Sequence, residues 1–151
     1  MKIKDGDFND LKVLELLRLH LSGMQENSPP KSVHALDLTG LQSTDISFWT
    51  VWSGDDLMGC GALKRLSADR AEIKSMRTHA HHMRKGVGAY LLEYIIANAR
   101  RRGFSMLSLE TGSGPAFMAA LGLYRKYGFE NGAAFADYEL SEFNQFLHLK
   151  L

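Results

Sequence analysis

The sequence contains very little cysteine, because Cys60 is the single cysteine among 151 residues. One cysteine cannot form an internal disulfide, and it excludes a cysteine-rich zinc site. Long apolar runs are also missing, since every run falls far short of the roughly 20 residues that span a bilayer. The opening residues, MKIKDGDFND, carry charges where a signal peptide has an apolar core. Together these absences predict a cytoplasmic protein without a membrane partner.

An excess of one charge is missing as well: 18 Lys and Arg residues stand against 17 Asp and Glu residues, for a formal net charge of +1. Proteins that bind nucleic acids usually carry a clear basic excess, so DNA and RNA are not expected partners. Apolar types make up 45% of the chain and charged types 23%, which is ordinary for a folded protein. This length is typical of one domain, and we expect residues 1–151 to form it.

Apolar periodicity and turn residues divide the chain into strands and helices. Strands are expected at 2–5, 48–52, 57–66, 71–78, 105–110, 135–140 and 143–149. Helices are expected from residue 11 to the Pro29-Pro30 pair, and over 32–41, 86–102 and 117–128. The order β-α-α-β-β-β-α-β-α-β-β predicts an α/β fold, in which a mixed sheet carries helices on both faces.

Strand 71–78, helix 86–102 and strand 105–110 form a strand-helix-strand unit. Two strands connected through a helix pair in parallel, by a right-handed crossover. Within strand 71–78, a regular alternation predicts one face made of Glu72, Lys74, Met76 and Thr78. It predicts an opposite face made of Ile73, Ser75 and Arg77.

The segment Arg84-Lys85-Gly86-Val87-Gly88-Ala89 lies between a predicted strand and a long predicted helix. Its glycines let the backbone approach a ligand closely, and the first amides of the helix have no partners within it. With the helix dipole and two basic side chains, these amides form a site suited to a diphosphate. The patterns of dinucleotide-binding and Walker loops are not met, which indicates another phosphate-bearing cofactor. The alternative is a helix start with two solvated bases.

A second motif, Leu123-Tyr124-Arg125-Lys126-Tyr127-Gly128-Phe129-Glu130, follows one strand and one helix later. Together with residues 84–89, the glycine loop, and with the order of the elements, this motif makes the chain resemble the GCN5-related N-acetyltransferase (GNAT) superfamily over nearly its whole length. Gly86 and Gly88 match the coenzyme A loop of that superfamily, whereas Met83 and Phe117 depart from it. The segments 28–38, 72–78, 109–112 and 135–138 are similar to a bacterial subgroup of small acetyltransferases.

The resemblance implies the GNAT acyl-CoA N-acyltransferase fold and acetyl-CoA as cosubstrate. The pantetheine arm would lie where strands 71–78 and 105–110 separate, and would pair with the backbone of Met76 and Thr78. The diphosphate would lie on the amides of residues 84–89. The residues expected to bind the cofactor are Met76, Arg77, Thr78, Arg84, Lys85, Gly86, Val87, Gly88, Ala89 and Thr111.

The resemblance also assigns roles in acetyl transfer. Tyr124 matches the general acid that protonates the departing thiolate, and the amide near Met76 would stabilise the oxyanion. Tyr124 could instead be a core tyrosine on a helix face. Glu72 is the expected general base, acting through water, and Glu110 at the end of the next strand is its rival. His79, His81 and His82 have no nearby cysteine or carboxylate at ligand spacing, so no metal is expected.

The leading hypothesis is therefore an acetyl-CoA-dependent N-acetyltransferase that works through a ternary complex. Its acceptor would be a primary amine of a small molecule or a peptide, which the sequence does not identify. The alternative is a non-catalytic acyl-CoA-binding module that regulates a partner protein. A homodimer is compatible with the apolar C-terminal segment 143–151, which would equally suit packing within one chain.

Overall fold

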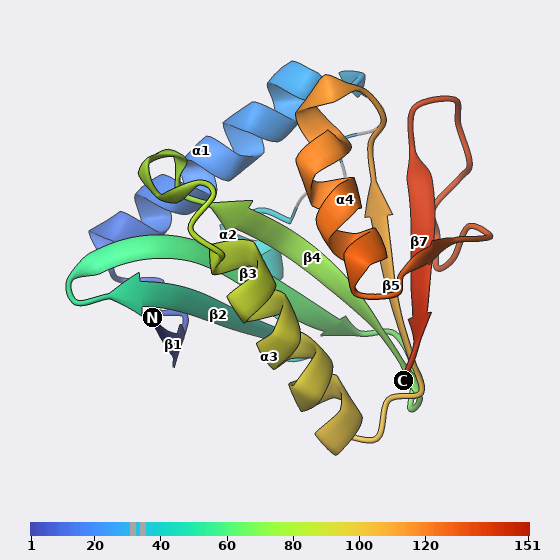
Figure 1. The fold of residues 1–151 in the computed structure, drawn as a ribbon, viewed down its shortest axis with the longest axis horizontal. Helices are drawn as coiled ribbons and strands as arrows, with labels where there is room; N and C mark the ends of the chain where they lie inside the picture. Colours follow the sequence, from blue (N-terminus) through green and yellow to red (C-terminus); the bar gives the residue numbers. More distant parts are fainter. Residues whose placement is uncertain (31–32, 34–35) are drawn as a thin grey trace.

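The computed structural model describes residues 1–151 except 31–32 and 34–35. Its centre is a seven-stranded sheet in the order β1-β2-β3-β4-β5-β7-β6 (Figure 1). The strands are β1 (Lys2–Asp5), β2 (Ile46–Ser53), β3 (Asp56–Arg65), β4 (Arg70–Thr78), β5 (Met106–Thr111), β6 (Glu130–Asn131) and β7 (Gln145–Lys150). Only β4 and β5 pair in parallel among the pairs of described strands, and this pair is the one that the strand-helix-strand unit predicted.

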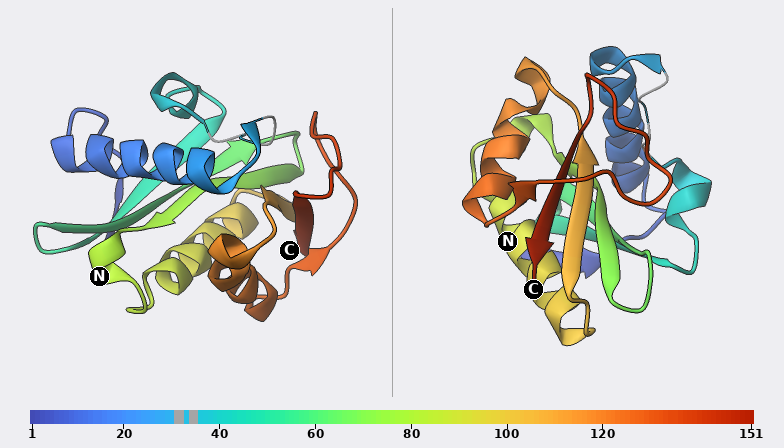
Figure 2. Two further views of the ribbon diagram at one scale, coloured as in Figure 1. Left: turned by 90° about the horizontal axis from the view of Figure 1, so that it is seen from above. Right: turned by 90° about the vertical axis from the view of Figure 1, so that its right-hand side faces the viewer.

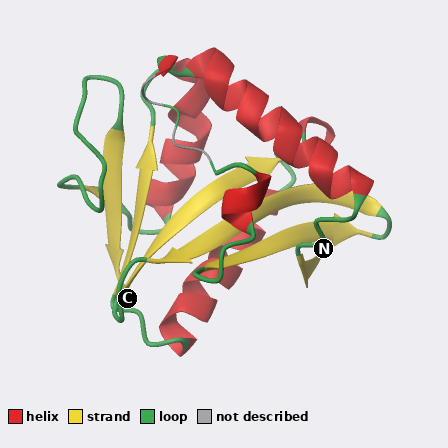
Figure 3. Ribbon diagram, turned by 180° about the vertical axis from the view of Figure 1, so that it is seen from behind, coloured by secondary structure: helices red, strands yellow, loops and turns green. Residues whose placement is uncertain are grey.

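The α-helices are α1 (Leu11–Asn27), α2 (Leu38–Leu41), α3 (Val87–Arg101) and α4 (Met118–Lys126). Two short 3₁₀ turns, η2 (Ala80–His82) and η3 (Pro115–Phe117), precede α3 and α4. Helix α1 lies across one face of the sheet, and α3 and α4 cover the other (Figures 2 and 3). The mixed sheet with helices on both faces is therefore confirmed.

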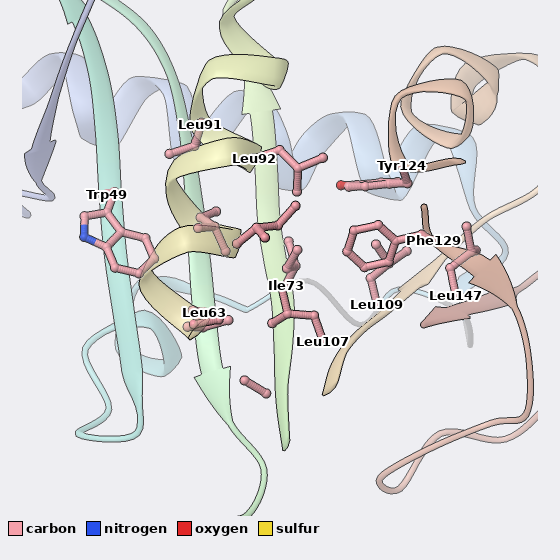
Figure 4. Packing of buried hydrophobic residues seen from close by; sticks show 14 of the residues in the cluster. Trp49, Leu63, Ile73, Leu91, Leu92, Leu107, Leu109, Tyr124, Phe129 and Leu147 are labelled. Carbon is pink, nitrogen blue, oxygen red and sulfur yellow. The ribbon is translucent and has the colours of Figure 1, made fainter. Parts of the chain in front are cut away.

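Each face of the sheet has its own apolar core. The α3 face buries one apolar stripe of that helix, made of Val87, Leu91, Leu92, Ile95, Ile96 and Ala99. Figure 4 shows part of this stripe packed against β3, β4 and β5. On the α1 face, Val13 and Leu16 pack with Leu41, Phe48 and Trp52. The two cores hold β4 firmly between α1 and α3.

Strand β4 does not alternate regularly, because it contains a bulge. Cys60 lies opposite Arg77 and Ala62 opposite Lys74, so two residues of β4 face Gly61 alone. Ser75, the first of the two, has a φ of 56°. The bulge changes which side chains share a face, and the predicted face of Glu72, Lys74, Met76 and Thr78 is wrong.

The observed faces follow from the packing of the residues that flank the bulge. A side chain at Gly61 would lie 2.5 Å from Sδ of Met76 and 2.9 Å from Cδ2 of Leu91, which places Met76 on the α3 face. A side chain at Gly23 of α1 would lie 3.1 Å from Nη1 of Arg77. Arg77 therefore extends toward α1, on the face that it shares with Glu72 and Lys74.

Strands β4 and β5 separate after a short paired stretch. Their register runs only from Arg70 opposite Met106 to Glu72 opposite Ser108. Figure 1 shows the two strands close together near the chain's C-terminus and apart at their own C-terminal ends. The second half of β4 therefore has backbone groups that β5 does not pair, as the sequence predicted.

One predicted strand is wrong, and one predicted helix begins later than expected. Residues 135–140 form no strand, because Phe135 instead packs its ring edge against Tyr138, Phe146 and His148. The second helix begins only at Leu38, where the Asp37 side chain accepts a hydrogen bond from the Gly40 amide. Of the predicted range 32–41, residues 32, 34 and 35 lie outside the described part of the chain.

The C-terminal strand is an interior strand of the sheet, between β5 and β6. Phe146 and Leu147 are buried, and Phe143, Leu149 and Leu151 pack against the core. The apolar residues of this segment therefore have packing partners within one chain, and the homodimer stays a prediction. Within the described ranges, no helix has the length and apolar character needed to cross a membrane.

Candidate active site

A cleft of about 790 Å³ opens where β4 and β5 separate. Helix α1 contributes His20 and Met24 to its lining, and α4 contributes Tyr124. The glycine loop before α3 lines another part of the same cleft. One continuous space therefore joins the predicted phosphate site to the predicted catalytic side chains.

Most of the residues expected to bind a cofactor line this cleft. They are Met76, Arg77, Thr78, Arg84, Gly86, Val87, Gly88, Ala89 and Thr111. Lys85 does not line it, because its side chain is exposed and lies 3.3 Å from Nδ1 of His82. Of the two basic residues in this segment, only Arg84 therefore lines the cleft.

The glycine loop has a backbone that favours bound anions. Arg84 and Gly86 both have positive φ, at 62° and 79°, and Gly86 is the N-cap of α3. The cap has no side-chain hydrogen bond, and the first described helical bond runs from the Tyr90 amide to the Gly86 carbonyl. The amides of residues 87–89 are therefore available to a ligand at the positive end of the helix dipole.

Tyr124 lies on the cleft side of α4. Its residue is 7% exposed, and burial raises the pKa of the phenol above its ordinary value. The ring packs edge-on against Phe129, at 5.7 Å between centroids, which fixes its direction. Figure 4 shows its oxygen projecting from α4 in the direction of α3. The hydroxyl makes no hydrogen bond within the described residues, so its proton is available to a bound group.

Glu72 lies on β4 within a buried triangle of polar groups. The Tyr138 hydroxyl donates to Oε2 of Glu72 at 2.5 Å, and Lys74 Nζ lies 3.3 Å from the same oxygen. Lys74 also donates to the Tyr138 hydroxyl at 2.5 Å. Burial and the Glu72 carboxylate raise the pKa of Tyr138, with a smaller contribution from Glu110. Tyr138 is therefore a neutral hydrogen-bond donor that orients the carboxylate.

Sequence reasoning missed Tyr138 as a site residue. The sequence places it in the predicted strand 135–140, and its partner Glu72 lies 66 positions away. No local pattern marks such a pair. Glu110, the rival base, also lines the cleft, so both candidate bases lie in one space.

Two further cleft residues were missed, His20 and Ser75. Burial lowers the pKa of His20 to about 4, with help from the charge of Arg77. Its Nδ1 and the Oγ of Ser75 are buried and have no hydrogen-bond partner in the described ranges of the chain. No sequence signal distinguishes His20 from the other residues of α1, or Ser75 from the alternating residues predicted for β4.

The histidine cluster 79–82 and Cys60 have no part in the proposed acetyl transfer. His79 stacks on His81 at 5.2 Å and meets His82 edge-on, and burial with these neighbours lowers the pKa of His79. No three metal-ligating side chains come together in the part of the chain that the structure describes. Cys60 is buried, and burial raises the pKa of its thiol to about 12, so it is no nucleophile at neutral pH.

Comparison with known proteins gives a consistent result. The model of the acetyltransferase (GNAT) family matches residues 13–129. The chain is 47% identical over 151 residues to the uncharacterized N-acetyltransferase YsnE of Bacillus subtilis (strain 168), covering 100% of both chains. A Klebsiella pneumoniae structure, described as an acyl-CoA N-acyltransferase, has a TM-score of 0.82 at 28% identity, covering 99% of this chain and 97% of that one.

A Bacillus subtilis acetyltransferase solved in complex with CoA has a TM-score of 0.74 at 22% identity, covering 99% of this chain and 98% of its own. At that identity the likeness concerns the fold, which is the predicted acyl-CoA N-acyltransferase fold. The family match over residues 13–129 and the full-length relative together confirm the predicted enzyme class. The chain belongs to the acetyltransferase (GNAT) family and is an N-acetyltransferase.

Proposed function

We propose that this enzyme transfers an acetyl group from acetyl-CoA directly to a primary amine of a small molecule or peptide. The observation that carries the proposal is the single cleft of about 790 Å³ that connects the glycine loop to Tyr124 and Glu72. A cosubstrate bound along it would bring its thioester between the two side chains. The acceptor amine would enter from the α1 face.

The cofactor would use backbone groups more than side chains. The amides of residues 87–89 would hold the diphosphate at the start of α3. The pantetheine arm would add to the edge of β4 beyond Glu72, where β5 no longer pairs with it. Gly88 also lets α3 approach α4 closely, since a Cβ there would lie 3.0 Å from Cδ2 of Leu123. The relative solved with CoA has the same fold.

The transfer step has a complete balance of bonds and protons. The amine nitrogen attacks the thioester carbonyl carbon, and the carbonyl oxygen gains charge that the amide near Met76 would stabilise. The carbon–sulfur bond then breaks, and the thiolate takes the proton of the Tyr124 hydroxyl. Burial raises the pKa of that hydroxyl, so it carries its proton at neutral pH.

The amine must lose a proton, and we propose Glu72 as the group that receives it, through water. Lys74 and Tyr138 both contact Oε2 of Glu72. They hold the carboxylate in one orientation, and no hydrogen bond to its Oε1 occurs within the described residues. Glu110 in the same cleft is the competing base.

The experiment that tests the proposal is a thiol-release assay with acetyl-CoA and a panel of primary amines, beside calorimetric titration with CoA. The proposal requires CoA binding together with amine-dependent thiol release. Binding without release from any amine would favour the alternative, a regulatory acyl-CoA-binding module.

A further inference from the structure

We propose that the acceptor carries a carboxylate as well as an amine, and that the Arg77 guanidinium binds this carboxylate on the α1 side of the cleft. The inference rests on the proposed function and names the substrate class for the same site. An amino acid or another small amino carboxylate would be such an acceptor.

The Arg77 guanidinium has a defined position but no partner among the described residues. It lies against α1, because a side chain at Gly23 would come within 3.1 Å of Nη1 and 3.2 Å of Nη2. Within the described part of the chain, the Arg77 side chain makes no hydrogen bond or ion pair. A half-buried guanidinium is costly to leave unpaired, since it has lost much of its water. A ligand carboxylate would satisfy it with two parallel hydrogen bonds.

Two further polar groups in the cleft lack partners among the described residues. His20 is 7% exposed and Ser75 is 9% exposed, and neither the Nδ1 of the first nor the Oγ of the second makes a hydrogen bond to any residue that the structure describes. Both residues line the cleft together with Arg77. Buried polar atoms in native proteins are nearly always paired, so three groups in one cleft without partners among the described residues point to a polar ligand.

The His20 imidazole is neutral at physiological pH, because burial and the Arg77 charge lower its pKa to about 4. Arg77 therefore supplies the positive charge at this part of the cleft, and His20 and Ser75 supply neutral hydrogen bonds. Among the described residues, no Asp or Glu carboxylate forms an ion pair with this guanidinium. This combination suits an anion and not a second ammonium group.

The part of the cleft next to the paired ends of β4 and β5 carries carboxylates. Glu72 and Glu110 line it from β4 and β5. Lys74 lies beside them and is already engaged by Glu72 and Tyr138, and Arg84 lines the cleft at the glycine loop, where the diphosphate is proposed to bind. An amino carboxylate would complement this pattern, with its amine toward the glutamates and its carboxylate toward Arg77. The same arrangement would direct the nucleophilic nitrogen away from Arg77 and toward the thioester.

The test compares amines in matched pairs. Glycine, β-alanine, 4-aminobutanoate, leucine and phenylalanine are each assayed beside the amine that lacks the carboxylate. Thiol release from acetyl-CoA gives kcat/KM, and calorimetry on CoA-saturated enzyme gives the affinity of each N-acetylated product. The variants are Arg77→Met, which removes the charge, and Arg77→Lys, which keeps the charge but not the planar fork. Arg100→Met, on the exposed end of α3, is the matched control.

We expect at least one amino carboxylate to exceed its decarboxylated partner at least ten-fold in kcat/KM. Arg77→Met should abolish that preference while leaving the Kd of acetyl-CoA unchanged, Arg77→Lys should retain part of it, and Arg100→Met should retain all of it. A preference for the amines without carboxylate would overturn the inference, as would the absence of both turnover and product binding for every amino carboxylate. A loss of CoA affinity in Arg77→Met would also overturn it, because the side chain would then serve the cofactor.

The inference and the proposed function fail in different ways. If wild-type enzyme does not bind CoA, the proposed function is wrong and the inference falls with it. If CoA binds and only amines without carboxylates are acetylated, the proposed function stands and the inference alone is wrong.

Discussion

The hydroxyl of Tyr138 donates a hydrogen bond to Oε2 of Glu72 at 2.5 Å, across 66 positions of sequence. Glu72 is 3% exposed, and Lys74 contacts both members of the pair. A loop residue thereby fixes the orientation of the carboxylate that we propose as the general base.

Tyr138→Phe removes this bond and leaves the ring in place. We expect the free energy of unfolding to fall by about 1–2 kcal/mol and kcat to fall about ten-fold, because a buried carboxylate and a buried ammonium each lose a partner. Thermal unfolding and thiol release measure the two effects. Tyr127→Phe is the matched control, since Tyr127 makes a hydrogen bond of the same length to Glu93 at the surface. Equal effects of the two variants would contradict a special role for Tyr138.

Glu72→Gln and Glu110→Gln separate the two candidate bases. Each change keeps the shape of the side chain and removes its ability to take a proton. We expect Glu72→Gln to lower kcat roughly 100-fold, because general bases contribute about that much. Glu110→Gln should change kcat much less. The reverse order would make Glu110 the base.

Tyr124→Phe tests the general acid. We expect kcat to fall roughly 100-fold with the Kd of acetyl-CoA unchanged, since only the proton donor is lost. Burial raises the pKa of Tyr124, so in wild-type enzyme the phenol keeps its proton beyond its ordinary pKa of 10. A decline in rate on the alkaline side below pH 10 must then come from another group. Unchanged turnover in Tyr124→Phe would remove this residue from the mechanism.

Gly88→Asp tests the phosphate site. A Cβ at Gly88 would lie 3.0 Å from Leu123 Cδ2, and a carboxylate there would repel a diphosphate. We expect the Kd of CoA to rise at least about 30-fold, which corresponds to roughly 2 kcal/mol. Gly122→Asp on the exposed side of α4 is the control, because a Cβ there meets nothing within 4 Å. Calorimetry with CoA measures both variants, and equal affinities would place the diphosphate elsewhere.

His20 makes stability depend on pH. Its pKa in the folded protein is about 4, below its ordinary value of 6.5. Below pH 6.5 the unfolded chain binds a proton that the folded chain does not, so stability falls as the pH decreases from 6.5 toward 4. The loss amounts to about 3 kcal/mol. Denaturant unfolding at several pH values should show this loss in wild type and in His81→Gln, an exposed control, but much less of it in His20→Gln.

The sequence predicted the order of helices and strands along the chain because their signals are local. The apolar stripe of α3 and the glycines before it need no distant partner to be recognised. The bulge at Ser75 could not be predicted in the same way, since no glycine or proline marks it and it depends on pairing with β3. The predicted faces of β4 are wrong for that reason, and so is the prediction that Arg77 lies on the face opposite Glu72 and Lys74.

The segment around Tyr138 shows a second limit. Its aromatic residues have high strand propensity, yet Phe135 and Tyr138 pack their rings against Phe146 of β7 instead of pairing their backbones. Tertiary packing overrides strand propensity here. Local motifs singled out the glycine loop and Tyr124, which both line the cleft, whereas the contacts of Glu72, Lys74 and Tyr138 required the fold.

The measurement that tests the central claim most directly is calorimetric titration of the purified protein with acetyl-CoA and with free CoA. A cleft that joins the glycine loop to Tyr124 and Glu72 predicts one site per chain, with micromolar affinity for both ligands. The Gly88→Asp variant should lose this binding. The absence of binding by wild-type protein at millimolar ligand would contradict the claim, and the glycine loop would then be only the start of a helix.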